Sequence, residues 1–183
     1  ILAVSSLPLA AQAQDASAWQ GINLGFTANT VMNGSQDYFD PFGPYDIKGS
    51  AQGAFVGYTW ASGAMAYGVE LSYAKADYNQ AEADGSADYQ DYKFNHTLDL
   101  KARVGYAFGK ALAYGVVGYG QSEWEDGPGG VYDGKGLIYG VGLDYLVSDR
   151  VFVGGEVLRR TMDSDGLFVA NVTTLSLRVG MKF

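Results

Sequence analysis

The chain has 183 residues, the length of a single domain, and carries a formal net charge of -8. It contains no cysteine and one histidine, which excludes disulfides, thiolate chemistry and a histidine-rich metal site. No apolar run reaches the roughly 18 residues typical of a membrane-spanning helix. The 26 glycines and 14 tyrosines favour many strands, and the mean hydropathy of -0.05 suits strands with one polar and one apolar face.

Residues 1–13 form an apolar stretch that ends in Ala11-Gln12-Ala13. A short apolar run before an A-x-A site is typical of the rear part of a secretory signal peptide. We therefore expect cleavage after Ala13, export of the protein, and one folded domain over residues 14–183. A loosely helical apolar leader is the alternative interpretation.

Eight segments after this leader alternate between apolar and polar residues, as strands with two different faces do. The links after the second, fourth and sixth segments are short, whereas the other links are longer and rich in Asp, Gly, Ser and Asn. This pattern predicts an all-β fold, an eight-stranded antiparallel up-and-down transmembrane β-barrel. The expected strands are Trp19–Thr30, Ile47–Trp60, Ala64–Asp77, Asp91–Phe108, Ala111–Trp124, Val131–Leu146, Arg150–Thr161 and Phe168–Phe183.

The segment Asp91–Phe108 shows most clearly which face of a strand points to lipid and which points into the barrel. Its apolar residues share one face, and Asp99, Lys101 and Arg103 share the other. A basic side chain facing lipid at the bilayer midplane costs about 2–4 kcal/mol, so the charged face is expected to point into the barrel. The segment Ala111–Trp124 has no comparable polar face, and its orientation stays open.

Seven charged residues fall on faces that are expected to point inward. Eight strands leave an interior just wide enough for side chains, so opposite charges there are expected to meet. The favoured interpretation is a buried network that fills the lumen, and the alternative is a narrow polar pore or gate. The residues of this predicted lumen network are Glu70, Asp99, Lys101, Arg103, Asp144, Glu156 and Arg178.

Aromatic residues flank the short links at one end of the predicted barrel. Amphipathic rings favour the membrane interface, so we expect a girdle of aromatic side chains on the periplasmic side. The general enrichment of aromatic residues in strands is the alternative explanation. The expected girdle residues are Tyr58, Trp60, Tyr67, Tyr106 and Tyr145.

Fourteen of the 20 acidic residues lie in or beside the longer links. Such an anionic rim argues against nucleic acid as a partner, and it favours weakly bound divalent cations or basic patches on host surface molecules. The ligand spacing and closing glutamate of an EF-hand are missing, so no dedicated metal site is predicted. Solvated acids without any bound ion are the alternative. We expect no cofactor.

His96 gives little support for catalysis. An outer-membrane hydrolase acting on lipid A would need this histidine beside a serine and a carboxylate, and no motif places a nucleophile next to it. A histidine at the membrane interface is the simpler interpretation. We expect that the protein is not an enzyme.

These features resemble the eight-stranded outer-membrane β-barrel family of Gram-negative bacteria, small porin-like surface antigens akin to outer-membrane protein X and the barrel domain of outer-membrane protein A. The likeness is carried by Ala11-Gln12-Ala13, by the strands around Gly53–Trp60 and Gly140–Tyr145, and by the apolar-polar alternation of Leu177–Phe183. It implies contact with outer-membrane lipids and lipopolysaccharide, and assembly by the barrel-assembly machinery, with Phe183 similar to the signal that this machinery reads. It also implies a structural, envelope-integrity or adhesive role through the acidic loops, with a small porin-like channel as the alternative.

Overall fold

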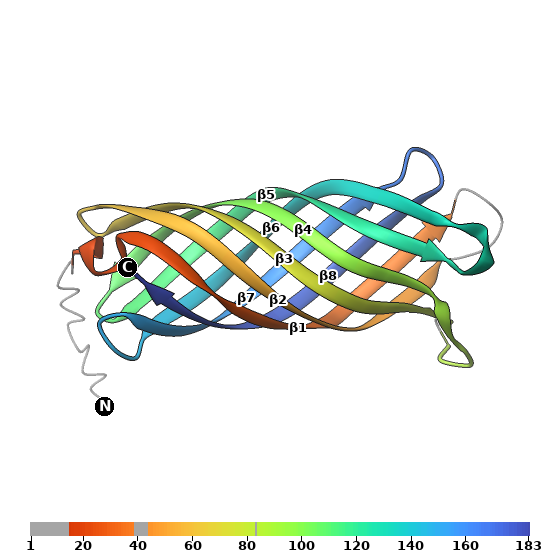
Figure 1. Cartoon of the computed structure of the whole chain (residues 1–183), viewed down its shortest axis with the longest axis horizontal. Helices are drawn as coiled ribbons and strands as arrows, with labels where there is room; N and C mark the ends of the chain where they lie inside the picture. The colour runs from red at the N-terminus through yellow and green to blue at the C-terminus, as the bar shows by residue number, and fades with distance from the viewer. Residues whose placement is uncertain (1–14, 39–43, 83) are drawn as a thin grey trace, which may run out of the picture.

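The computed structural model describes residues 15–38, 44–82 and 84–183; the predicted signal segment therefore lies outside the described residues. Eight antiparallel strands close into a barrel in chain order, with β8 paired to β1, so the predicted topology is confirmed (Figure 1). Among the described residues, no helix is long and apolar enough to cross a membrane. The strands are β1 (Gly21–Tyr38), β2 (Tyr45–Ser62), β3 (Met65–Ala81), β4 (Asp88–Phe108), β5 (Ala111–Asp126), β6 (Val131–Leu146), β7 (Val151–Asp163) and β8 (Phe168–Lys182).

The two ends of the barrel differ in their connections. At one end, here called the turn end, strands are joined through residues 63–64, 109–110 and 147–150, and the chain terminates there at Phe183 (Figure 1). At the other end, the loop end, residues 164–167 and three further links join the strands, one of which contains the short 3-10 helix η2 (Gly127–Gly129).

The strands extend further toward the loop end than the sequence predicted. β1 continues past the predicted end at Thr30 to Tyr38, and Asp46, expected in a loop, is paired with Ala81. The Asp, Gly and Ser content of these segments suggested loops, but cross-strand hydrogen bonding continues well beyond the apolar part of the sheet. Most of the predicted loop sequence is therefore strand, and the connections themselves are short.

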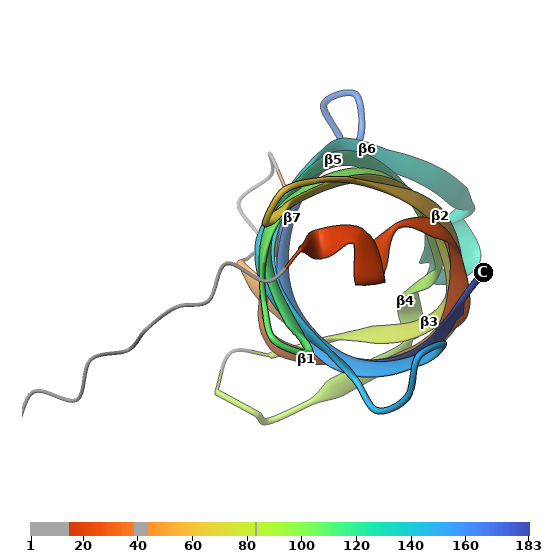
Figure 2. The same ribbon diagram turned by 90° about the vertical axis from the view of Figure 1, so that its left-hand side faces the viewer.

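Trp19 was expected to begin the first strand, but it ends a short 3-10 helix, η1 (Ala16–Trp19). The backbone N–H of Ala16 donates a hydrogen bond to the carbonyl of Gly63 at 2.7 Å. Trp19 is buried and packs edge-on against Phe152, with ring centroids 5.9 Å apart. η1 therefore lies across the barrel opening at the turn end (Figure 2).

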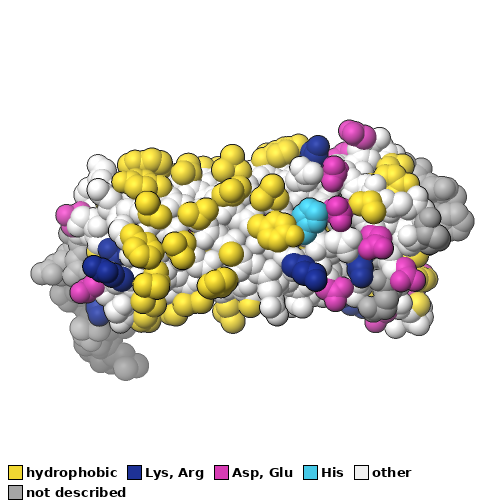
Figure 3. Space-filling model, in the orientation of Figure 1, with side chains coloured by type: hydrophobic (Ala, Val, Ile, Leu, Met, Phe, Trp, Pro, Cys, Tyr) yellow, Lys and Arg dark blue, Asp and Glu magenta, His cyan; other side chains and the backbone are white. Residues whose placement is uncertain are grey.

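Successive residues of each strand point to opposite sides of the barrel wall. In β4, Leu98 and Leu100 are 42% and 60% exposed, whereas Asp99 and Lys101 are 2% and 3% exposed. This is the reverse of a water-soluble protein, and a band of hydrophobic side chains covers the visible face from near the turn end to past the middle of the barrel (Figure 3). A sheet with apolar residues outside and charges inside requires lipid around it.

The orientation of β5, left open by the sequence, is defined by burial. Leu112, Tyr114 and Val116 are buried and point inward, whereas Val117 and Tyr119 are more than half exposed. The inward face of β5 is thus mainly apolar. Its alternation is masked in the sequence because both faces carry apolar or small residues.

The interior is layered along the barrel axis. Along β4, the inward residues run from Ala107 at the turn end through Arg103, Lys101 and Asp99 to Phe94 toward the loop end. Charged side chains therefore lie between two apolar regions. The cluster toward the loop end comprises Ile47, Ala51, Ala74, Ala76, Tyr78, Phe94, Trp124, Met162, Phe168, Ala170 and Val172.

Candidate functional site

Glu70 is the centre of an ion-pair network inside the barrel. Its carboxylate receives Lys101 Nζ at 2.7 Å, Arg103 Nη1 at 3.2 Å and Arg178 Nη2 at 2.6 Å. Lys101 lies directly opposite Glu70 in the β3·β4 pairing, and Arg178 reaches it from β8. Three bases around one buried carboxylate leave an excess of positive charge that other groups must balance.

Asp144 and Glu156 provide that balance from β6 and β7. Arg103 Nη2 donates to Asp144 at 2.7 Å, and Glu156 accepts from Lys101 at 2.9 Å and from Arg178 at 3.1 Å. All five side chains are almost entirely inaccessible to solvent. The network therefore links strands on opposite sides of the lumen.

Asp99 does not join the ion pairs around Glu70. It pairs with Arg160, whose Nη2 donates to Asp99 Oδ2 at 2.6 Å and whose Nη1 donates to Thr174 at 3.0 Å. Arg160 was not among the predicted network residues. It lies four positions after Glu156 on the same face of β7, and this spacing could have identified it.

The buried charges are balanced and leave little space. A lumen cavity of about 10 Å³ is lined in part by Asp99, Lys101, Glu156 and Arg160, which is near the volume that one water molecule needs. With Arg160 included, the network has four acidic and four basic residues: Glu70, Asp99, Asp144, Glu156, Lys101, Arg103, Arg160 and Arg178. We call this set the lumen network.

Tyr114 of β5 supports the lumen network without carrying a charge. Its ring centroid lies 3.6 Å from the guanidinium carbon of Arg103 and 5.9 Å from that of Arg178, and its hydroxyl donates to Asp144 at 3.3 Å. Such cation–π contacts are favourable in desolvated sites. Gly142 leaves room for the ring, because a Cβ atom at that position would collide with it. Sequence reasoning missed Tyr114 because it considered only ionisable pairs.

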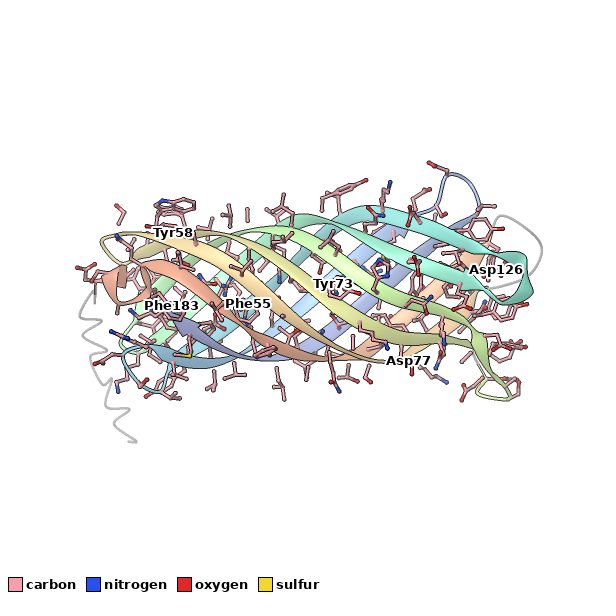
Figure 4. The ribbon with its side chains drawn as sticks, viewed as in Figure 1. Phe55, Tyr58, Tyr73, Asp77, Asp126 and Phe183 are labelled. Carbon is pink, nitrogen blue, oxygen red and sulfur yellow. The ribbon has the colours of Figure 1, made fainter. Side chains whose placement is uncertain are left out.

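Aromatic side chains close the lumen on both sides of this network. Toward the loop end, Trp124 packs against Phe94 and Phe168, with ring centroids 4.7 Å and 5.8 Å apart, and all three are buried. Toward the turn end, Phe55 packs against Phe152 at 6.1 Å, next to η1. Figure 4 shows Phe55 near the turn end, where it contributes to this closure.

Two rows of aromatic residues lie on the outside of the barrel. The row at the turn end consists of the five expected girdle residues, among which Tyr58 packs on Trp60 at 4.8 Å (Figure 4). A second row, not anticipated from the sequence, borders the hydrophobic band toward the loop end and comprises Tyr73, Tyr119 and Tyr139, each about half exposed. Both rows have the placement of membrane-interface residues, and that role stays a prediction.

Phe183 lies at the turn end, and its side chain is 63% exposed. Its backbone N–H donates a hydrogen bond to the carbonyl of Ile22 at 2.8 Å. The ring contributes little to the packed interior. Its role as an assembly signal stays a prediction.

Many of the acidic groups at the loop end contact neighbouring polar groups. Asp84 accepts a hydrogen bond from the N–H of Ser86 at 2.9 Å, and hydrogen bonds from Ser86 lower the pKa of Asp84. Glu82 accepts from the hydroxyl of Tyr89 at 2.7 Å. Within the described ranges there is no group of three or more acidic or histidine residues that could hold a metal ion. The hypothesis of cation binding at the loop end therefore concerns weak binding spread over several carboxylates.

We expect calcium to slow amide exchange at the loop end only modestly. The reason is that a divalent ion screens neighbouring carboxylates without a preformed cage of ligands. The measurement is hydrogen exchange of residues 77–91 and 121–134 in lipid, first with calcium and then with a chelator. Identical exchange would end the cation hypothesis, and strong protection at one ion per barrel would reveal a dedicated site.

His96 lies on the outer face of β4, just beyond the hydrophobic band. Its Nδ1 is 3.8 Å from Glu123, and its ring packs against Tyr73 with centroids 5.7 Å apart. The hydroxyl residues next to this pair in sequence, Thr97 and Ser122, are buried on the inward face. The arrangement therefore offers a histidine and a carboxylate without an adjacent serine or threonine nucleophile.

A closed antiparallel sheet with lipid-compatible residues outside and balanced charges inside defines a membrane-spanning β-barrel. A family model described as "Outer membrane protein beta-barrel domain" matches residues 1–183, and the chain belongs to this family. The protein is therefore located in the Gram-negative outer membrane. Short turns of such barrels face the periplasm, so we expect the turn end to be periplasmic and the loop end to face outward.

Individual relatives agree with this assignment. A "22 kDa outer membrane protein" of Rhizobium leguminosarum bv. viciae is 29% identical over 108 residues, which are 59% of this chain and 46% of the relative. The chain thus spans about half the length of that protein. Among solved structures, Neisserial surface protein A is similar with a TM-score of 0.56 and 16% identity, covering 89% of this chain and 97% of the other.

Two further solved barrels show the same fold. OprG from Pseudomonas aeruginosa has a TM-score of 0.55 and 15% identity, covering 90% of this chain and 96% of the other. Ail, the attachment invasion locus protein of Yersinia pestis, has a TM-score of 0.53 and 12% identity, covering 90% and 99%. At these identities the likeness concerns the fold alone.

Proposed function

We propose that this protein is a non-conducting, non-enzymatic barrel that holds an acidic loop end outside the cell, for envelope integrity or adhesion. The observation that carries the proposal is the filled lumen. The lumen network crosses the barrel between its two apolar regions, and the aromatic contacts of Trp124 and of Phe55 lie on either side of it. An ion path would have to displace these groups, and breaking a buried ion pair is costly.

The loop end supports a role outside the cell. The strands remain paired with one another beyond the hydrophobic band, and acidic side chains dominate this outer part (Figure 3). Asp77 and Asp126 mark its extent in Figure 4. An anionic surface attracts basic patches on other molecules and repels polyanions. The structure of Ail with sucrose octasulfate, a heparin analogue, concerns a sulfated ligand; the acidity of this chain's loop end favours a partner of the opposite charge.

The decisive experiment is conductance of the refolded barrel in planar lipid bilayers. We expect no discrete current steps from the intact protein. We also expect none from Phe94→Ala with Trp124→Ala, because this variant retains the lumen network. A general porin inserted in the same bilayers shows that channels are detectable. Discrete steps from the intact protein would overturn the proposal in favour of the small channel.

Envelope integrity and adhesion can be separated with one variant. Asp84, Asp88, Asp133 and Asp165 are exposed acids at the loop end, so their replacement by asparagine removes charge without disturbing the interior. If adhesion is the role, cells carrying this variant should bind a basic protein surface less well and keep normal detergent resistance. Equal binding would leave envelope integrity as the proposed role.

A further inference from the structure

On every strand, the outward-facing residues change from apolar to polar at one position. Toward the loop end, apolar or tyrosine residues give way to a first polar residue, and on four strands this residue is lysine, arginine or histidine. Lys75 is paired with both Gln52 and His96, so these positions share one level of the sheet. The first polar outward residues are Thr30, Gln52, Lys75, His96, Gln121, Lys135, Arg159 and Thr173.

On β3 and β7 an acidic residue lies beyond the base on the same face, whereas Glu123 and Asp163 lie directly opposite His96 and Lys135. Asp77 comes after Lys75 on the outward face of β3, and Asp163 comes after Arg159 on β7. Lys and Arg side chains and the histidine accordingly lie between the hydrophobic band and the acidic end (Figure 3). Lipid phosphates lie at the edge of the hydrocarbon layer, so on β3 they meet Lys75 before they meet Asp77.

A groove on the outer face of β2, β3 and β4 lies at this boundary. The pairing of β3 with β4 shifts between Lys75 and Tyr78, and such irregularities often redirect side chains beside binding sites. The groove has a volume of about 830 Å³. Its polar lining consists of Ser50, Gln52, Lys75, Asp77, Lys93 and Asn95.

We propose that this groove binds the phosphate group of an outer-leaflet lipid, the phosphorylated glycolipid of the outer membrane. Lys75 and Lys93 supply two positive charges to the same groove, and Gln52 adds an amide donor. Tyr73 lies next to Lys75 on the outward face, so the acyl chains of the same lipid would run along the hydrophobic band. Asp77 lines the same groove, and its carboxylate offsets one of the two positive charges.

A lipid is favoured over a soluble anion by the position of the groove. A sulfated glycan approaching from the medium would first meet the acidic loop end, which repels it. A lipid approaches sideways within the membrane and meets Lys75 directly at the end of the hydrophobic band. The proposal depends only on the orientation of the barrel, and it stands whether or not the lumen conducts.

The test is native mass spectrometry of the refolded barrel in detergent, titrated with bisphosphorylated lipid A. Lys75→Gln with Lys93→Gln should weaken binding about three- to tenfold, since exposed charge contacts each contribute modestly. The matched control, Lys110→Gln with Lys182→Gln, removes the same charge at the turn end and should bind like the intact protein. Raised salt should shrink the difference between the two variants.

Three further probes decide the chemistry of the ligand. Dephosphorylated lipid A should bind the intact protein as weakly as lipid A binds the Lys75/Lys93 variant. Inorganic phosphate should not compete at equal concentration, and sucrose octasulfate should not bind in a Lys75-dependent way. The proposal is overturned if the Lys75/Lys93 variant binds lipid A normally, if phosphate removal has no effect, or if either soluble anion binds the groove as tightly as lipid A.

Discussion

Replacing Arg178 with alanine is expected to lower the free energy of unfolding by about 3–5 kcal/mol, the usual cost of removing one partner of a buried ion pair. Arg178 contacts Glu70 at 2.6 Å, Glu156 at 3.1 Å and Asp144 at 3.4 Å, and its side chain is fully inaccessible. Its loss leaves the lumen network with one uncompensated negative charge. The measurement is urea unfolding of the refolded protein in lipid vesicles, followed by tryptophan fluorescence.

The control for this prediction is Arg150→Ala, which removes an exposed arginine from a link at the turn end. It should change stability by less than about 0.5 kcal/mol, as surface substitutions usually do. Arg178→Lys should fall between the two, because one ammonium cannot replace a planar guanidinium that contacts three carboxylates. Unchanged stability of Arg178→Ala would mean that water enters the lumen and solvates the remaining charges.

The barrel topology could be predicted because lipid and lumen impose opposite chemistry on alternate residues. In β4 the contrast between Leu98–Leu100 and Asp99–Lys101 is visible without any structure. β5 lacks this contrast because Tyr114 faces two arginines and needs no charge of its own. Its orientation therefore depends on partners from other strands, which periodicity along one strand does not reveal.

The outer parts of the strands were underestimated for a related reason. Outside the membrane, the outward face is polar, so a segment rich in Asp and Gly was assigned to loops. The inward face still carried a signal there, because Tyr78 and Met162, one residue beyond the predicted strand ends at Asp77 and Thr161, are buried. Trp19 was wrongly assigned to the first strand, because its burial depends on η1 lying across the barrel opening.

The members of the lumen network were largely accessible from the sequence, but their pairing was not. The contact between Asp99 and Arg160 joins residues 61 positions apart, and it depends on the register of every strand between them. The basic residues at the loop-end edge of the hydrophobic band also depend on the register of the strands. Lys75 and His96 are far apart in the chain, and they lie directly opposite each other only when β3 is paired with β4.

Deleting Phe183 is expected to lower the amount of folded protein in the outer membrane severalfold while leaving the refolded barrel nearly as stable as before. The deletion removes an exposed ring and one backbone hydrogen bond, to Ile22, which contributes about 0.5–1.5 kcal/mol. A larger loss in cells than in vitro would then reflect recognition during assembly. The measurements are heat-modifiable electrophoretic mobility of outer-membrane fractions and urea unfolding of the purified protein.

Two variants distinguish recognition from simple loss of an aromatic residue at the membrane interface. Phe108→Ala removes a similarly exposed phenylalanine at the turn end and should leave membrane levels nearly unchanged. Phe183→Trp keeps an aromatic residue in the last position and should assemble close to normally. If Phe108→Ala lowers the membrane level as much as the deletion does, Phe183 acts through the interface like any other girdle residue. If the deletion leaves the level unchanged, the alternation of β8 without its final ring is sufficient for assembly.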